Sequence, residues 1–120
     1  MEPRPSILIV DDEQQIRKLL SVTFTRAGFQ VTTASNGLDA VGCCSNQPFD
    51  VVLSDVRMPE MDGHQLMRWI AVHHPLTRTV LMSGYDATCE KCAYSPRCVL
   101  VGKPFKAMEV LDAVKHALAA

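Results

Sequence analysis

The sequence predicts a single α/β domain in which a parallel sheet is covered by helices on both faces. Short apolar runs alternate five times with segments whose apolar residues recur at helical spacing, and the connections between them are short. The first run, residues 7–10, is apolar throughout, as expected of a strand that is buried on both faces of a parallel sheet. At 120 residues the chain is long enough to bury one core without disulfides or metals.

The first half of the chain contains three predicted strands, each followed by a predicted helix. The strands are residues 7–10, 30–33 and 50–54. The helices are marked by apolar residues at helical spacing: Ile16, Leu20, Phe24 and Ala27 before Gly28; Leu38, Val41 and Cys44 or Ser45 before Pro48; Leu66, Met67 and Ile70 before residues 73–75.

The second half repeats the alternation. Residues 79–82 and 99–101 are predicted strands, and residues 87–93 form a weaker helix candidate between them. From residue 105 onward the predicted helix is amphipathic, with one face formed by Met108, Leu111, Val114 or Lys115, and Leu118.

Composition excludes several classes of partner. The formal net charge is −1, so no overall positive field attracts nucleic acid or an anionic membrane. No apolar run approaches the roughly 20 residues that a membrane-spanning helix needs. The segment MEPRPS leads directly into the first strand without the apolar core of a signal peptide, so we expect a cytoplasmic protein.

Polar residues follow four of the five predicted strands, where ligands bind in sheets of this kind. They are Asp11 and Asp12 after the first strand, Asp55 after the third, Ser83 after the fourth and Lys103 after the fifth. If the first and third strands are neighbours, the three carboxylates converge, and a cation is then needed to offset their repulsion. Oxygen ligands suit Mg²⁺.

This set fits transfer of a phosphoryl group to a carboxylate nucleophile, with Lys103 and Ser83 contacting phosphoryl oxygens. Each residue alone has a simpler explanation. The Asp11–Asp12 pair serves equally well as a helix cap, Ser83 as a turn residue and Lys103 as a surface charge.

Four segments resemble the receiver domain of two-component response regulators: ILIVDDE, VVLSDVRMPEMDG, VLMSG and VGKPF. The resemblance covers nearly the whole chain and implies one receiver domain over residues 1–120, with no output domain visible. It also implies a flavodoxin-like (βα)5 fold with strand order 2-1-3-4-5. A domain of this family is a signalling phosphoacceptor rather than an enzyme with a separate substrate.

The resemblance implies a role for each strand-end residue. Asp55 would accept the phosphoryl group from a histidine kinase or phosphotransfer protein, while Ser83 and Lys103 contact the phosphate. Mg²⁺, or Mn²⁺, would be held by the side chains of Asp12 and Asp55, by Asp11 through water, and by the backbone carbonyl of Arg57. Arg57 and Tyr85 would flank the pocket and, being bulky, slow hydrolysis of the phosphoaspartate.

The residues that would transmit the phosphorylation signal to a partner depart from the family pattern. Leu100 stands where many members carry an aromatic residue that moves together with the residue equivalent to Ser83, so the usual switch is altered. The segment between Ser83 and Lys103 is slightly short for the family. We expect output through the face formed by the fourth helix, fifth strand and fifth helix, toward an output domain, a downstream protein or a phosphorylation-dependent homodimer.

Five cysteines occur in the chain, and three of them share the shortened segment: Cys89, Cys92 and Cys98. A Cys-x2-Cys pair is half of a zinc motif, but no second pair follows. Reduced thiols are therefore favoured over a disulfide, and a disulfide over zinc. Cys43 and Cys44 are adjacent on a helix, so at most one of them faces the core.

Two other functions compete with the receiver. A phosphatase of the haloacid-dehalogenase type needs a second acid two residues after its nucleophile, and Arg57 at that position cannot donate a proton near neutral pH. A degenerate receiver that only docks other proteins would not need the full set of polar strand-end residues.

Overall fold

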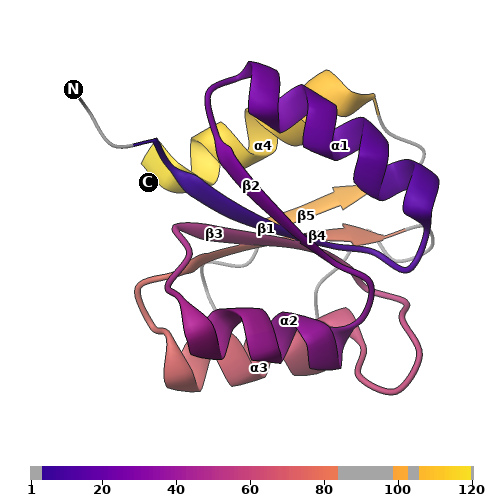
Figure 1. The fold of residues 1–120 in the computed structure, drawn as a ribbon, viewed down its shortest axis with the longest axis vertical. Coiled ribbons are helices and arrows are strands. Elements are labelled where there is room, and N and C mark those ends of the chain that lie inside the picture. The colour runs from indigo at the N-terminus through magenta and orange to yellow at the C-terminus, as the bar shows by residue number, and fades with distance from the viewer. Residues whose placement is uncertain (1–3, 84–98, 103–105, 120) are drawn as a thin grey trace.

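The computed structural model describes residues 4–83, 99–102 and 106–119. Five parallel strands form one sheet in the order β2-β1-β3-β4-β5, as predicted (Figure 1). The strands are β1 (Ser6–Val10), β2 (Gln30–Ala34), β3 (Val51–Asp55), β4 (Arg78–Ser83) and β5 (Val99–Gly102). The helices are α1 (Gln14–Arg26), α2 (Gly37–Asn46), α3 (Gly63–His73) and α4 (Ala107–Ala119).

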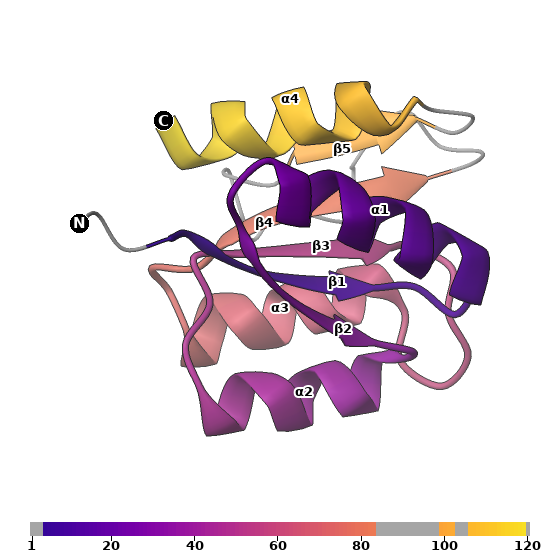
Figure 2. The ribbon, with the colours of Figure 1, turned by 45° about the horizontal axis from the view of Figure 1, so that its top comes forward.

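The helices form two layers, one on each face of the sheet. Helices α1 and α4 lie on one face, and α2 and α3 lie on the other (Figure 2). The helix predicted at residues 87–93 lies outside the described residues, so α4 is the fifth helix of the sequence-based prediction. None of the helices in the described ranges is long and apolar enough to cross a membrane.

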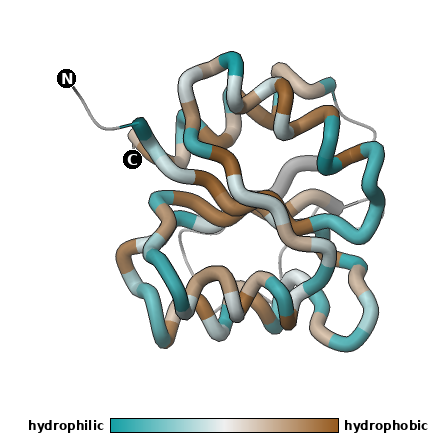
Figure 3. Tube along the Cα trace, in the orientation of Figure 1, coloured by the Kyte–Doolittle hydropathy of each residue, from teal (hydrophilic) through white to brown (hydrophobic). Residues whose placement is uncertain are grey.

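The central strands explain the continuous apolar runs. Ile7 and Ile9 pack into the core under α1 and α4, whereas Leu8 and Val10 pack into the core over α2 and α3. All four are fully buried, because alternate side chains enter opposite layers and both layers are covered. Burial of each such side chain stabilises the fold by about 1.5–3 kcal/mol. Figure 3 shows hydrophobic residues concentrated along these strands.

The predicted apolar faces of two helices were wrong in part. Leu38 and Met108 are 53% and 61% exposed. At about 100° per residue, each lies roughly a third of a turn from the centre of its helix's buried face. Those faces are formed by Gly37, Ala40 and Cys44 in α2 and by Val110, Leu111, Val114 and Ala117 in α4. Ala27, predicted to be the last apolar position of its helix, is the exposed C-cap residue of α1.

Four of the five strands, β2 to β5, end one residue later than predicted. Strand β3 includes Asp55, and β4 includes Ser83. These two residues are therefore the last residues of their strands, fixed by the sheet itself. In Figure 2 the strand arrowheads point toward one edge of the sheet, where Asp11, Asp55 and Ser83 end β1, β3 and β4 or directly follow them.

Candidate functional site

Three carboxylates meet at the carboxyl edge of the sheet. Asp11 and Asp12 follow β1, and Asp55 ends the neighbouring strand β3, where Val10 is the partner of Ser54. One oxygen from each carboxylate lies within 4.8 Å of the others. Asp11 is fully buried, Asp55 is 6% exposed and Asp12 is exposed, so the cluster opens to solvent on the Asp12 side.

Asp11 is held through its backbone and its side chain. Its amide donates to the carbonyl of Ala34 at the end of β2, at 3.2 Å. Its Oδ1 accepts a hydrogen bond from the amide of Glu13 at 2.9 Å, and its backbone carbonyl accepts one from Arg17 Nη1 at 2.7 Å. The N-cap of α1 is Glu13, so neither Asp11 nor Asp12 is the helix cap that was the simpler explanation of the pair.

Asp55 is positioned by close backbone packing around the start of α3. The amide of Gly63 donates to the carbonyl of Val56 at 2.8 Å, and the amide of Val56 donates to the carbonyl of Met82 at 3.0 Å. A Cβ on Gly63 would lie 2.9 Å from both Val56 Cα and Leu81 Cδ2, and it would also meet the carbonyl of Asp55. Only glycine fits there without displacing the backbone that carries Asp55.

The loop between β3 and α3 contains a tight turn. The amide of Met61 donates to the carbonyl of Pro59 at 2.8 Å, and Glu60 between them has φ of 69°. This is a γ-turn, whose positive φ costs a non-glycine residue about 1–3 kcal/mol. The turn leads the chain away from Asp55.

The loop ends in a capping box. The carboxylate of Asp62 accepts from the amide of Gln65 at 2.8 Å, and the Gln65 side chain accepts from the amide of Asp62 at 2.9 Å. Helix α3 therefore begins at Gly63, with Asp62 as its N-cap. His64 lies half-buried in the first turn of α3.

The remaining site residues are described only in part. Arg57 is exposed, two residues beyond Asp55. The backbone of Ser83, the residue after the Asp55 partner Met82, pairs with Gly102. Leu100 of β5 pairs with Leu81 of β4. Outside the described residues lie Tyr85, Lys103 and the three cysteines Cys89, Cys92 and Cys98. The expectation that these cysteines bind no zinc is therefore untested.

The carboxylate cluster fits a hard divalent cation. Its ligand atoms are all oxygen, two of the three carboxylates are almost fully buried, and the third faces solvent. Such a set matches the preference of Mg²⁺ for one or two carboxylates together with water. Three carboxylates this close repel one another, and a cation removes that cost.

Of the two described cysteines, only one is buried, as expected. Cys44 is buried and Cys43 is half-buried, and both are free thiols. Burial raises the pKa of the Cys44 thiol to about 11, and the neighbouring Cys43 adds to the shift. At neutral pH the Cys44 thiol is therefore protonated and acts as a small apolar core side chain.

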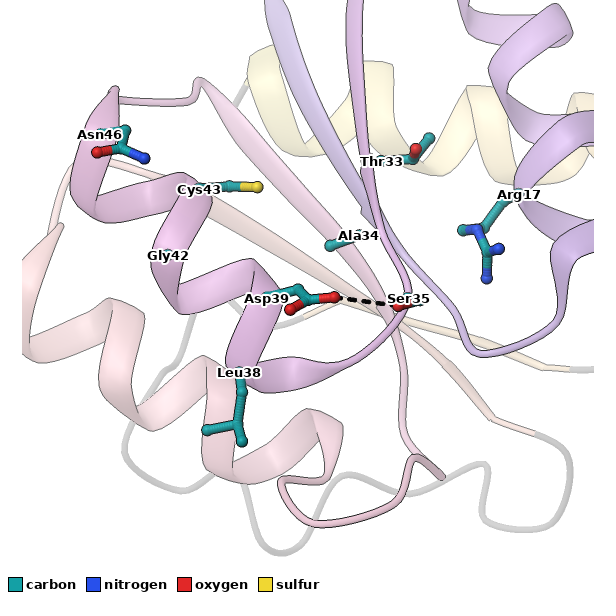
Figure 4. Close-up of a pocket in the computed structure, with 9 residues that line it drawn as sticks. All are labelled: Arg17, Thr33, Ala34, Ser35, Leu38, Asp39, Gly42, Cys43 and Asn46. Carbon is teal, nitrogen blue, oxygen red and sulfur yellow. Dashed lines mark hydrogen bonds between the residues drawn. The ribbon is translucent and has the colours of Figure 1, made fainter.

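A separate hollow lies at the β2 edge of the sheet (Figure 4). It has a volume of about 560 Å³ and is bordered by Arg17 of α1, by the end of β2 and by α2. Ser35 donates to Asp39 across its floor at 3.1 Å. Neither Asp12 nor Asp55 lines it, so it is distinct from the carboxylate cluster.

Comparisons with known proteins agree with this geometry. Residues 7–115 match the response regulator receiver domain family. The chain is 40% identical to the regulatory protein AtoC of Escherichia coli over 115 residues, covering 93% of this chain and 25% of AtoC. It is 34% identical to sporulation initiation phosphotransferase F of Bacillus subtilis, covering 93% of this chain and 92% of that protein.

Solved structures give the same result. A response regulator receiver protein from Sinorhizobium medicae superposes with a TM-score of 0.89 at 31% identity, covering 98% of this chain and 96% of that one. The chemotaxis response regulator CheY4 of Vibrio cholerae superposes with a TM-score of 0.87 at 27% identity, covering 96% and 99%.

The chain spans about a quarter of the length of AtoC but nearly all of the sporulation phosphotransferase. The three-carboxylate cluster lies within the residues that match the family. The match over residues 7–115, together with the β2-β1-β3-β4-β5 sheet and that cluster, identifies the chain as a member of the response regulator receiver domain family, the phosphoacceptor domains of two-component systems.

Proposed function

We propose that Asp55 is the phosphoacceptor of this domain and that Mg²⁺ binds beside it. The observation that carries the proposal is the three-carboxylate cluster, in which Asp55 is the last residue of a buried strand. The sheet holds the backbone of Asp55, and one of its carboxylate oxygens lies within 4.8 Å of an oxygen of Asp11 and of Asp12. A preorganised nucleophile of this kind lowers the entropic cost of reaching the transition state.

In the proposed reaction, an oxygen of Asp55 forms a bond to phosphorus as the bond between phosphorus and the donor's histidine nitrogen breaks. Asp12, Asp55 and the backbone carbonyl of Arg57 would hold Mg²⁺ directly, and Asp11 would hold it through water. When bound, Mg²⁺ offsets the negative charge of the carboxylates and of the phosphoryl oxygens. Ser83 would donate to a phosphoryl oxygen, and Lys103 would pair with the phosphate.

The proposed partner is a histidine kinase or a histidine phosphotransfer protein in the cytoplasm. Downstream, a signal would pass from Ser83 and Leu100 to the face that includes β5 and α4, and then to an output domain, another protein or a second copy of the chain. Among the relatives, the match to sporulation initiation phosphotransferase F covers 92% of that protein. The regulatory protein AtoC instead extends well beyond the matched segment.

The test is phosphorylation by a small-molecule phosphodonor in the presence of Mg²⁺, followed by intact mass measurement. We expect the wild type to gain the mass of one phosphoryl group and to lose the gain when Mg²⁺ is chelated. Asp55→Asn is expected to gain none. Asp112→Asn, which alters an exposed carboxylate in α4, is the matched control and is expected to behave as wild type. A mass gain in Asp55→Asn equal to that of the wild type would contradict the proposal.

A further inference from the structure

Arg17 links helix α1 to the loop that carries two of the three carboxylates. It lies in the first turn of α1, four residues after Glu13, and its amide donates to the Glu13 carbonyl at 3.1 Å. Its side chain turns back along the helix, and Nη1 donates to the backbone carbonyl of Asp11 at 2.7 Å. A hydrogen bond from a charged donor at this distance is short and strong.

Backbone hydrogen bonds also hold this loop. The N-cap residue Glu13 makes no side-chain capping bond to α1. The Asp11 amide is bonded to β2 and its Oδ1 to the Glu13 amide, which fix one side of the loop. The bond from Arg17 fixes the opposite side, at the carbonyl between Asp11 and Asp12.

Arg17 is half-buried and lines two hollows. It lines the hollow at the end of β2 and a second hollow of about 430 Å³ with Lys18, Ser21 and Val22. Figure 4 shows Arg17 extending from α1, apart from the Ser35–Asp39 pair at the start of α2.

Arg17 has two opposite effects on a cation at the carboxylate cluster. Its positive charge repels Mg²⁺ and, taken alone, would weaken binding. Its hydrogen bond holds the Asp11–Asp12 backbone in one orientation and, taken alone, would strengthen binding, since groups that orient metal ligands typically change affinity by about 10- to 100-fold. Removal of the side chain reveals which effect is larger, because the two predict changes of opposite sign.

We propose that Arg17 is a positioning residue that holds Asp11 and Asp12 in the geometry that binds Mg²⁺, and that this effect outweighs its charge repulsion. The inference rests on the proposed function, since it presumes that the carboxylate cluster binds Mg²⁺. Arg17 acts through the Asp11 carbonyl and does not itself contact the ion or the phosphoryl group.

The test is Mg²⁺ titration of the unphosphorylated protein by calorimetry. We expect Arg17→Met to weaken Mg²⁺ binding roughly tenfold, and Arg17→Lys to recover part of the loss by restoring a donor. Lys18→Met removes the same charge from the next residue of α1, which is exposed, and is expected to leave the affinity unchanged or slightly higher. The amide of Glu13 should exchange its hydrogen faster in Arg17→Met than in wild type.

The outcomes separate this inference from the proposed function. Arg17→Met with unchanged or tighter Mg²⁺ binding overturns the positioning role while leaving Asp55 as phosphoacceptor. Wild-type protein that binds no Mg²⁺ overturns both. Equal weakening in Arg17→Met and Lys18→Met overturns the positioning role as well, because the effect would then not depend on the bond to Asp11. Partial unfolding of Arg17→Met would also lower its apparent affinity for Mg²⁺. In that case the variant is less stable than wild type without Mg²⁺, the dissociation constant of its folded fraction is unchanged, and the positioning role is overturned.

Discussion

At the scale of single residues, Gly63 has almost no room for a side chain. Any side chain there meets the backbone of Asp55 and Val56 and the side chain of Leu81. We predict that Gly63→Ala destabilises the domain by about 1–3 kcal/mol, because neither the sheet nor the start of α3 can move away cheaply.

The matched control for Gly63→Ala is Gly42→Ala. Gly42 is an exposed residue of α2, and a Cβ there would meet no heavy atom within 4 Å. This substitution should stabilise the domain by about 0.5–1 kcal/mol through helix propensity. Urea unfolding midpoints measure both variants, and a shift of the same sign in the two would contradict the account of Gly63.

Cys44 makes the free energy of unfolding depend on pH in the alkaline range. Its thiol pKa is raised from 9.0 to about 11, mainly by burial. Because the folded pKa lies above the unfolded one, the thiol contributes stability below pH 9, and this contribution is lost as pH rises toward 11. We predict that the free energy of unfolding falls more steeply across this range in wild type than in Cys44→Ala. Equal slopes in urea titrations at several pH values would show that another group is responsible.

At the scale of elements, the capping box at the start of α3 stabilises the end of the loop that follows Asp55. Asp62 and Gln65 satisfy each other's amides in the same loop that leaves Asp55. Asp62→Ala should cost about 1 kcal/mol, as loss of an N-cap usually does. Asp112→Ala, on the exposed face of α4, should change stability by less than about 0.5 kcal/mol. Thermal unfolding followed by circular dichroism distinguishes the two, and identical midpoints would contradict a stabilising role for the box.

The elements also show what the sequence could reveal and what it could not. The buried strands were predictable, because runs such as Ile7–Val10 are apolar on both alternating faces. The buried faces of α2 and α4 were less so, because Leu38 and Met108 are apolar yet exposed. Nothing in a spacing pattern distinguishes them from core residues, since exposure depends on how each helix is rotated against the sheet.

The site was predictable to a similar degree. Asp11, Asp12 and Asp55 were recognisable because the ends of adjacent parallel strands meet at one edge. The tight fit of Gly63 was missed, although the Asp-Gly pair after the loop was a usable signal for it. The bond from Arg17 to the Asp11 carbonyl was also missed. It joins a side chain to a backbone atom, and only the three-dimensional path of the loop brings the two together.

At the scale of the whole molecule, the carboxylate cluster makes stability depend on the cation. Without a metal the three carboxylates repel, so Asp55→Asn should be more stable than wild type in chelator. With Mg²⁺ the order should reverse, because binding to the folded state adds about 2.7 kcal/mol at a concentration of 100 times the dissociation constant. Melting temperatures of both proteins, with and without Mg²⁺, test this. If Mg²⁺ raises the melting temperature of the wild type no more than that of Asp55→Asn, the carboxylate cluster does not make stability depend on the cation.

Phosphorylation at Asp55 can be tested by locating the residue that carries the phosphoryl group. After treatment with a phosphodonor and Mg²⁺, borohydride reduction converts an acyl phosphate on aspartate into homoserine, which peptide mass spectrometry can locate. We predict homoserine at position 55 and at no other aspartate, and none when Mg²⁺ is chelated. Homoserine at position 11 or 12, or none at all in protein that is folded and bound to Mg²⁺, would contradict the account.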